Sequence, residues 1–177
     1  MFPSHDKAIW DSGLSLTGTK NITIVGSGTP IITRGSTSDP LITIQPSSGN
    51  PSVRISGFKF DNGTNTGTEK NSILIRGKSD GTGSGLTNIR IDHNYFNKGR
   101  HAVYLIYWVE AVIDSNTFNN CDVAVMVLGD NSFSWKREIA AGTVHANFIE
   151  DNTFLADESN RDVNLSEQIY HQSGGVS

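Results

Sequence analysis

The sequence predicts an all-β solenoid of about five stacked coils, and three observations indicate this fold. A phrase of about ten residues, NIRIDHNYFN at 88–97, recurs along the chain. Within each copy apolar and polar residues alternate, which is the period of a half-buried strand. The intervals between the copies are rich in Gly, Asn, Ser, Thr and Asp, which favour turns.

Five copies of the phrase align without internal gaps. They are NITIVGSG at 21–28, which is the weakest, VRISGFKFDN at 53–62, NIRIDHNYFN at 88–97, EAVIDSNTFNN at 110–120 and ANFIEDNTFLA at 146–156. The copies start about 31, 36, 22 and 36 residues apart, so loops of different length separate constant units. The last four copies share columns of identical residues: Ile55, Ile91, Ile113 and Ile149; Phe60, Phe96, Phe118 and Phe154; and Asn94, Asn116 and Asn152, with Phe58 in the remaining copy.

A second strand is expected after each copy, following a short turn. The expected strands are LITIQ at 41–45, NSILIRG at 71–77, HAVYLIYW at 101–108, DVAVMVLG at 122–129 and DVNLSEQIY at 162–170. A repeat of roughly 22 residues that tolerates insertions predicts a solenoid in which each coil stacks on the last.

The I-x-x-N-x-F phrase, the aliphatic and Phe columns and the Asn ladder resemble the right-handed parallel β-helix family, the pectate-lyase-like superfold. The resemblance extends from Trp10 to Gly175. It implies parallel strands ~4.8 Å apart, so that residues of one column stack on each other. The leucine-rich repeat is the main competitor, but its L-x-x-L-x-L period is missing. A β-sandwich would not repeat one phrase in fixed register.

Length and composition narrow the class of protein. A chain of 177 residues with 36% hydrophobic content predicts one domain over residues 1–177. The net charge of -4 is spread along the chain without a basic block, which argues against nucleic acid as a partner. No signal peptide and no membrane-spanning apolar run are recognised, so the chain is cytoplasmic or lacks a targeting segment. The family resemblance implies an extracellular or surface location. Cys121, the only cysteine, is expected to be a buried small hydrophobe.

The two ends of the solenoid raise a separate question. End coils expose strand edges that need caps, and five coils is a small number for this superfold. We therefore expect either that the chain is a fragment or that its open end is closed by another chain, such as a second copy.

An outward acidic column follows the Ile column and suggests chemistry. Asp92, Asp114 and Glu150 occupy it in consecutive copies, with Ser56 before them. Stacked carboxylates repel one another, and this favours a general acid and base pair or a cation site, with Asp92 and Asp114 as ligands for Ca²⁺. The alternative is that these acids are solvated, splayed apart and inert.

Two basic residues are further catalytic candidates. The triplet Ile91, Asp92, His93 resembles the I-D-H element of pectate lyases, although Arg90 stands where that family has an aromatic residue. A solvated or turn-capping histidine is the alternative for His93. The alignment also places Arg100 one coil from Asp122, where the arginine could neutralise a uronate, act as a base, or form a stacking salt bridge.

Aromatic residues supply candidate substrate contacts. Tyr107 and Trp108 end one expected strand, and Trp135 and Arg137 lie in the insertion from 129 to 143. Exposed rings beside charged groups suit stacking on a sugar, whereas the alternative is that they pack against the coils.

Two functions of different class follow. The first is a polysaccharide lyase or glycoside hydrolase that uses the acidic column on the outer face, with or without Ca²⁺. The second is a non-catalytic β-helix, either a carbohydrate-binding or adhesive module of the phage-tail or cell-surface type, or an inert fragment of a longer solenoid. The first predicts a groove along the axis, and the second predicts solvated acids and no groove.

Overall fold

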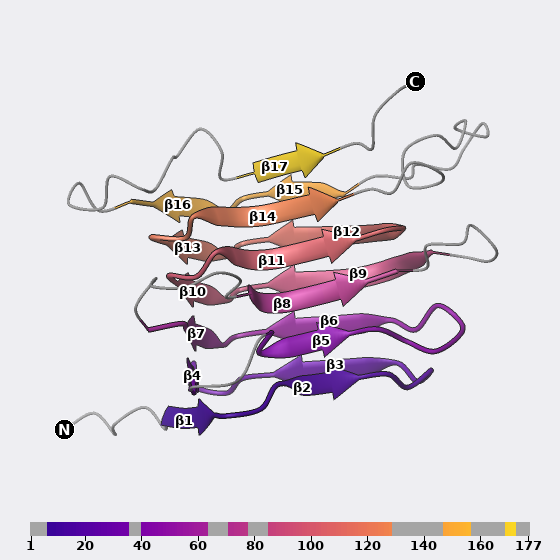
Figure 1. Cartoon of the computed structure of the whole chain (residues 1–177), viewed down its shortest axis with the longest axis horizontal. Helices are drawn as coiled ribbons and strands as arrows, with labels where there is room; N and C mark the ends of the chain where they lie inside the picture. The colour runs from indigo at the N-terminus through magenta and orange to yellow at the C-terminus, as the bar shows by residue number, and fades with distance from the viewer. Residues whose placement is uncertain are drawn as a thin grey trace.

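The computed structural model describes residues 7–35, 40–63, 71–77, 85–128 and 147–156, together with the backbone of 169–172. Its strands form three parallel sheets stacked along one axis, from the N-terminal strands at one end to the C-terminal strands at the other (Figure 1). Each turn of the chain adds one strand to each sheet. The described strands make five complete coils and two strands of a sixth, which confirms the prediction of a parallel β-helix.

The three sheets are named A, B and C in the order in which the chain enters them. Sheet A contains β1 (Lys7–Trp10), β4 (Ile31–Arg34), β7 (Lys59–Asp61), β10 (Tyr95–Asn97), β13 (Thr117–Asn119) and β16 (Thr153–Leu155). Sheet B contains β2 (Leu14–Leu16), β5 (Ile42–Ile44), β8 (Asn71–Arg76), β11 (His101–Ile106), β14 (Val123–Leu128) and β17 (Ile169–Gln172). Sheet C contains β3 (Ile22–Val25), β6 (Val53–Ser56), β9 (Leu86–Asp92), β12 (Val109–Asp114) and β15 (Phe148–Glu150).

The columns of identical residues stack as the sequence predicts. The strand register pairs the four isoleucines of the Ile column in order, and Ile24 of the weakest copy continues the column below Ile55. Inside the solenoid Phe60, Phe96 and Phe118 stack with ring centroids 5.1 Å apart, and Phe154 continues the stack at 5.4 Å from Phe118. Apolar side chains of all three sheets thus fill one continuous core.

The repeated phrase corresponds to two strands, not to one. In NIRIDHNYFN the chain ends β9 at Asp92, turns at His93 and Asn94, and begins β10 at Tyr95 in a different sheet. Each coil therefore has three strands. The alternation breaks at this corner, where Ile91 and Asp92 are both buried, and the three consecutive polar residues from Asp92 to Asn94 were the only trace of the turn in the sequence.

The expected second strands are the strands of sheet B. The ranges 41–45, 71–77, 101–108 and 122–129 contain β5, β8, β11 and β14. In the expected strand at 162–170 most residues lie outside the described part of the chain, and β17 begins at Ile169. Cys121 is buried as expected, and burial, with the charge of Asp122, raises the pKa of its thiol to about 12. Within the described residues, the structure has no helix that could span a membrane.

Candidate functional site

The corner between sheet C and sheet A carries the residues that the sequence singles out. The residue at the turn has a positive φ in four consecutive coils: Gly57 (80°), His93 (55°), Ser115 (56°) and Asp151 (52°). Glycine adopts this left-handed region without strain, and Asp and His adopt it more readily than most other residues. The turn is therefore a local property of each coil, and it aims the preceding carboxylate and the following amide along the axis.

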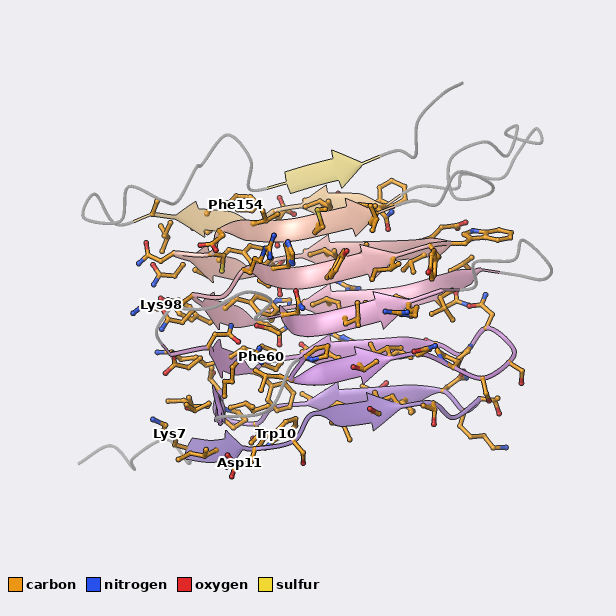
Figure 2. All side chains as sticks on the ribbon, viewed as in Figure 1. Lys7, Trp10, Asp11, Phe60, Lys98 and Phe154 are labelled. Atoms are coloured by element: carbon orange, nitrogen blue, oxygen red, sulfur yellow. The ribbon has the colours of Figure 1, made fainter. Side chains whose placement is uncertain are left out.

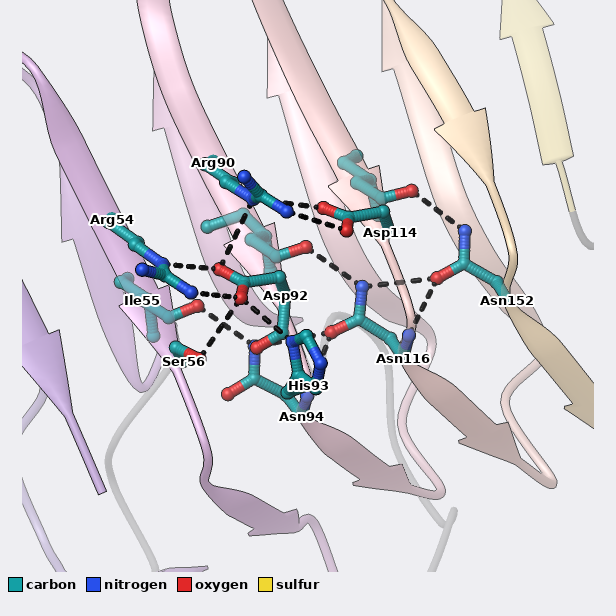
Figure 3. Close-up of polar contacts among 12 residues, drawn as sticks. Arg54, Ile55, Ser56, Arg90, Asp92, His93, Asn94, Asp114, Asn116 and Asn152 are labelled. Carbon is teal, nitrogen blue, oxygen red and sulfur yellow. Dashed lines mark hydrogen bonds and ion pairs between the residues drawn. The ribbon is translucent and has the colours of Figure 1, made fainter. Parts of the chain in front are cut away.

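The Asn column forms a ladder of hydrogen bonds along this corner (Figure 3). The Nδ2 of Asn116 donates to the carbonyl oxygen of Ile91 at 2.9 Å, and its Oδ1 accepts from the backbone N–H of Asn94 at 2.9 Å. Asn94 makes the same two contacts: its Nδ2 donates to the carbonyl of Ile55 at 3.0 Å, and its Oδ1 accepts from the N–H of Phe58 at 3.1 Å. Asn152 likewise donates to the carbonyl of Ile113 at 2.7 Å and accepts from the N–H of Asn116 at 2.9 Å. The ladder supplies partners for buried backbone groups, so it has a structural role.

Asp92 is buried at this corner by groups that bind its carboxylate. Nε and Nη2 of Arg54 donate to its two oxygens at 2.8 and 2.6 Å, and the hydroxyl of Ser56 donates at 3.2 Å. The side chain of Asp92 has no exposed surface. Burial acts to raise the pKa of this carboxyl, but the hydrogen bonds from Arg54, His93 and Ser56 and the charge of Arg54 outweigh burial. The pKa is lowered from 3.8 to about 2.

Asp114 has the equivalent partner one coil further on. Nε and Nη2 of Arg90 donate to its two oxygens at 3.2 and 2.9 Å, and its side chain is 11% exposed. Glu150 lies above Asp114 in register and is exposed. In Figure 3 each arginine reaches from one coil to the aspartate of the next. Asp92 and Asp114 are therefore neither splayed and solvated nor a bare pair of acids, because an arginine neutralises each of them.

His93 projects from the turn with 63% of its side chain exposed. Its Nδ1 lies 2.8 Å from Oδ2 of Asp92. An ionised carboxylate only accepts hydrogen bonds, so Nδ1 is the donor in this contact. This geometry fits a turn residue that helps to hold Asp92, and the contact orients the exposed imidazole.

The calcium site expected at Asp92 and Asp114 remains a prediction. Both carboxylates already bind guanidinium groups, so a Ca²⁺ ion would have to displace Arg54 and Arg90. Across the described residues no group of three or more His, Cys, Asp or Glu side chains is placed to hold a metal ion.

Arg100 lies at a different corner from the acidic column. It follows β10 and precedes β11, between sheets A and B, and is exposed. The register places Asp122 directly above it, since Val123 pairs with His101 and the N–H of Val123 donates to the carbonyl of Arg100. The fold therefore keeps the stacking of Arg100 and Asp122 but does not bring Arg100 to Asp92.

Tyr107 and Trp108 lie at the corner between sheets B and C. Tyr107 has a φ of 65° and is half-buried, with the guanidinium of Arg76 5.9 Å from its ring centroid. Trp108 is only 5% exposed and its Nε1 donates to Glu110. A Cβ on Gly85 would lie 2.3 Å from the indole, so the ring packs flat against that glycine and presents no open face for a sugar. Trp135 and Arg137 lie outside the described residues.

Two features of the outer surface were not recognised in the sequence. The first is the arginine column of Arg54 and Arg90, which stands two positions before the acidic column in the same alignment. The second is a ladder on the outer face of sheet A, in which Asn97 donates to Asp61 at 2.9 Å and Asn119 donates to Asn97 at 2.8 Å. Both features occupy single alignment columns, which was the signal that could have revealed them.

Comparison with known proteins adds no relative: no family model, no curated protein and no solved structure matches this chain.

Proposed function

We propose that the chain binds a polysaccharide along the outer face of sheet A and does not cleave it. The surface concerned, the sheet A strip, consists of two adjacent columns of half-buried residues: Lys59, Tyr95 and Thr117; and Asp61, Asn97 and Asn119. The observation that carries the proposal is the hydrogen-bonded ladder of Asp61, Asn97 and Asn119, because it holds polar side chains in a fixed row along the axis.

The ladder leaves hydrogen-bonding capacity for a ligand. Each asparagine amide has two N–H donors and an oxygen with two lone pairs, and the ladder uses one donor of Asn97 and one of Asn119. Sugar hydroxyls both donate and accept, so they match a row of amides and carboxylates. The rows repeat at ~4.8 Å along the strands' stacking direction, which gives an extended ligand equivalent contacts on successive coils.

Tyr95 provides an apolar ring beside the row. The ammonium of Lys59 lies over this ring, 5.0 Å from its centroid, in a cation–π contact between neighbouring coils. A half-buried tyrosine presents an apolar body and a polar hydroxyl, the combination that suits the faces and the rim of a sugar ring. The resemblance to the pectate-lyase-like superfold supports a polysaccharide as the ligand by analogy alone.

The pairing of the acidic column favours binding over cleavage. A general acid needs a pKa near the working pH, whereas the pKa of Asp92 is lowered to about 2. Asp114 is held by Arg90 in the same geometry. The carboxyl of Asp92 is thus not poised to give up or accept a proton in glycan cleavage.

The proposal is tested by affinity electrophoresis of the purified chain in gels that contain neutral or acidic polysaccharides. Reducing ends and the ultraviolet absorbance of unsaturated sugars are measured in parallel. We expect retardation by at least one polysaccharide without either product. Asn97→Ala should weaken retardation about tenfold, as expected for the loss of one or two hydrogen bonds. The control, Asn88→Ala, removes an exposed asparagine from sheet C and should leave retardation unchanged.

Three results would overturn the proposal: cleavage products, no retardation in any gel, or an equal effect of Asn97→Ala and Asn88→Ala. The third result would mean that the ligand lies on another face.

The Asp92 and His93 pair favours a second candidate, a lyase or hydrolase acting at the corner between sheets C and A. The hydrogen bond to Asp92 orients the imidazole, and its Nε2 could then act as a general base toward a bound sugar. If cleavage products form, His93→Gln should abolish them and Asn97→Ala should not. If His93→Gln leaves the rate unchanged, this second candidate fails.

A further inference from the structure

Among the strands that the structure describes, each strand of the first coil has a neighbour on one side only. Sheet A begins with β1, sheet B with β2 and sheet C with β3, and the far ends of sheets A and B are β16 and β17. Such edge strands present backbone N–H and C=O groups that can pair with another strand. Because all pairing in the solenoid is parallel, the edge at one end has the orientation needed to pair with the edge at the other end.

Apolar side chains gather at the same two ends. In the part of the chain that the structure describes, the exposed large hydrophobic residues are Ile9 (65%), Leu14 (37%) and Val25 (60%) on the first coil, and Phe148 (46%) and Leu155 (45%) on the last strands of sheets C and A. Between Ile9 and Leu155 the same outward column holds Thr33, Asp61, Asn97 and Asn119, which are polar. The outer surface is thus apolar at the two ends and polar between them. Exposed apolar surface of this kind is typical of regions that another protein surface covers.

A hollow of about 430 Å³ opens at the first coil. It is lined by consecutive residues of β1, the following turn and the start of β2: Ile9, Trp10, Asp11, Ser12, Gly13 and Leu14. Figure 2 labels Trp10 and Asp11 at this end and Phe154 at the opposite end of the stack. All of these lining residues belong to the first coil, at the end of the stack where an added coil would lie.

We propose that copies of this chain stack end to end, with the β16 and β17 edge of one copy against the β1 and β2 edge of the next. The register supports a second copy as the occupant. When the next copy continues sheet A in the same register, its Ala8 takes the position above Phe154. Its Ile9 then takes the position above Leu155. Phe154 already stacks on Phe118 with one face, and the small side chain of Ala8 leaves room for its other face.

The stacked contact also joins the exposed Leu155 of one copy to the exposed Ile9 of the next. In sheet B the same continuation of the register pairs the backbone of Ile169 in one copy with that of Leu14 in the next. Sheet C ends one coil earlier, at β15, so the contact that the described residues carry runs through sheets A and B. The two surfaces in contact are different, which makes the association heterologous and allows it to continue into longer stacks as the concentration rises.

The test is the mass of the full chain in solution, measured by light scattering and analytical ultracentrifugation over a range of concentrations. We expect the mass of the wild type to rise with concentration. Ile9→Lys places a charge on the leading surface and Leu155→Lys on the trailing surface, so each variant alone should be monomeric. Asn88→Lys adds the same charge at an exposed position in the middle of the stack and should associate like the wild type.

Mixing the two end variants distinguishes the proposal from other modes of association. Each variant keeps one unaltered end, so an equimolar mixture should form a dimer and nothing larger. This dimer also shows that both variants fold, since an unfolded chain would offer no matching edge. A wild type that stays monomeric, a mixture that stays monomeric, or self-association of Leu155→Lys through its first coil would each overturn the proposal.

Discussion

Asp92 has three kinds of hydrogen-bond donor around one carboxylate, and two of them, Arg54 and Ser56, belong to the coil before it. The charged pair therefore joins neighbouring coils on the outside, as the core does on the inside. The side chain of Arg54 is 44% exposed and stays hydrated, so the carboxylate is neutralised without burying both charges. A pair of this kind stabilises the stack and does not resemble an activated acid.

The lowered pKa of Asp92 makes stability depend on acid pH. The unfolded chain takes up a proton at this group near 3.8, before the folded chain does near 2, so stability is fully present above about pH 4 and is lost between pH 4 and 2. The shift corresponds to roughly 2 kcal/mol. Urea unfolding measured from pH 6 to 2 should show a smaller loss in Asp92→Asn than in the wild type.

The matched control for this pH profile is Asp151→Asn, which removes an exposed carboxyl from the same corner. Its profile should parallel that of the wild type. Equal slopes for Asp92→Asn and the wild type would show that Arg54 does not hold this carboxyl in solution.

At the scale of the element, the corner depends on its asparagine. Asn116 is 1% exposed and satisfies the N–H of Asn94 and the carbonyl of Ile91. Asn116→Ala leaves both buried groups without partners, at about 1–3 kcal/mol each. The free energy of unfolding should fall by about 2–6 kcal/mol, measured by denaturant titration. Thr117→Ala, a truncation at the next, outward-facing position, serves as the control; an equal loss there would refute a special role for the ladder.

The free energy lost when a stacked phenylalanine is truncated should depend on whether its coil lies in the middle or at the end of the solenoid. Phe118 is 1% exposed between two rings, whereas Phe154 is half-buried at the end of the stack. Phe118→Ala should lower the free energy of unfolding by about 3–5 kcal/mol, and Phe154→Ala by less than half of that, at concentrations where the chain is monomeric. Equal losses would mean that Phe154 is covered in the monomer as well.

The sequence predicted those elements whose residues are identical from coil to coil. The Ile, Phe and Asn columns could be aligned because each requires one side chain shape in one environment, and the structure stacks them in that order. The corner was not predicted, because Gly57, His93, Ser115 and Asp151 share a backbone conformation and no side chain property. The arginine partners were missed because Arg54 binds a residue 38 positions away, across a loop.

At the scale of the whole molecule, each coil contacts only its neighbours, so stability should vary along the axis. Side chains of β1, β2 and β3 are mostly exposed or half-buried, whereas those of β8, β11 and β12 are largely buried. Hydrogen exchange followed by mass spectrometry should therefore show the fastest amide exchange in β1–β3 and the slowest in β8–β12. Uniform protection at low protein concentration would contradict this gradient.

The outer surface of the solenoid also explains why the fold was easier to predict than the site. Inside, a polar or badly fitting residue costs packing energy, which restricts each column to apolar residues. Outside, an aspartate can be a catalytic acid, a metal ligand or the partner of an arginine. Which role it has depends on the residues that the neighbouring coil places beside it. For Asp92 and Asp114 the deciding residues are Arg54 and Arg90.

The direction of the asparagine ladder has a consequence for how the chain acquires its fold. Every asparagine of the ladder donates to a carbonyl, and accepts from an N–H, of the coil that precedes it in the sequence. A coil that leaves the ribosome therefore finds the partners of its own corner side chain already in place, and it needs no later segment to satisfy that side chain. Each finished coil acts as a template for the next one, so the solenoid can grow during translation from its N-terminal coil, one layer at a time.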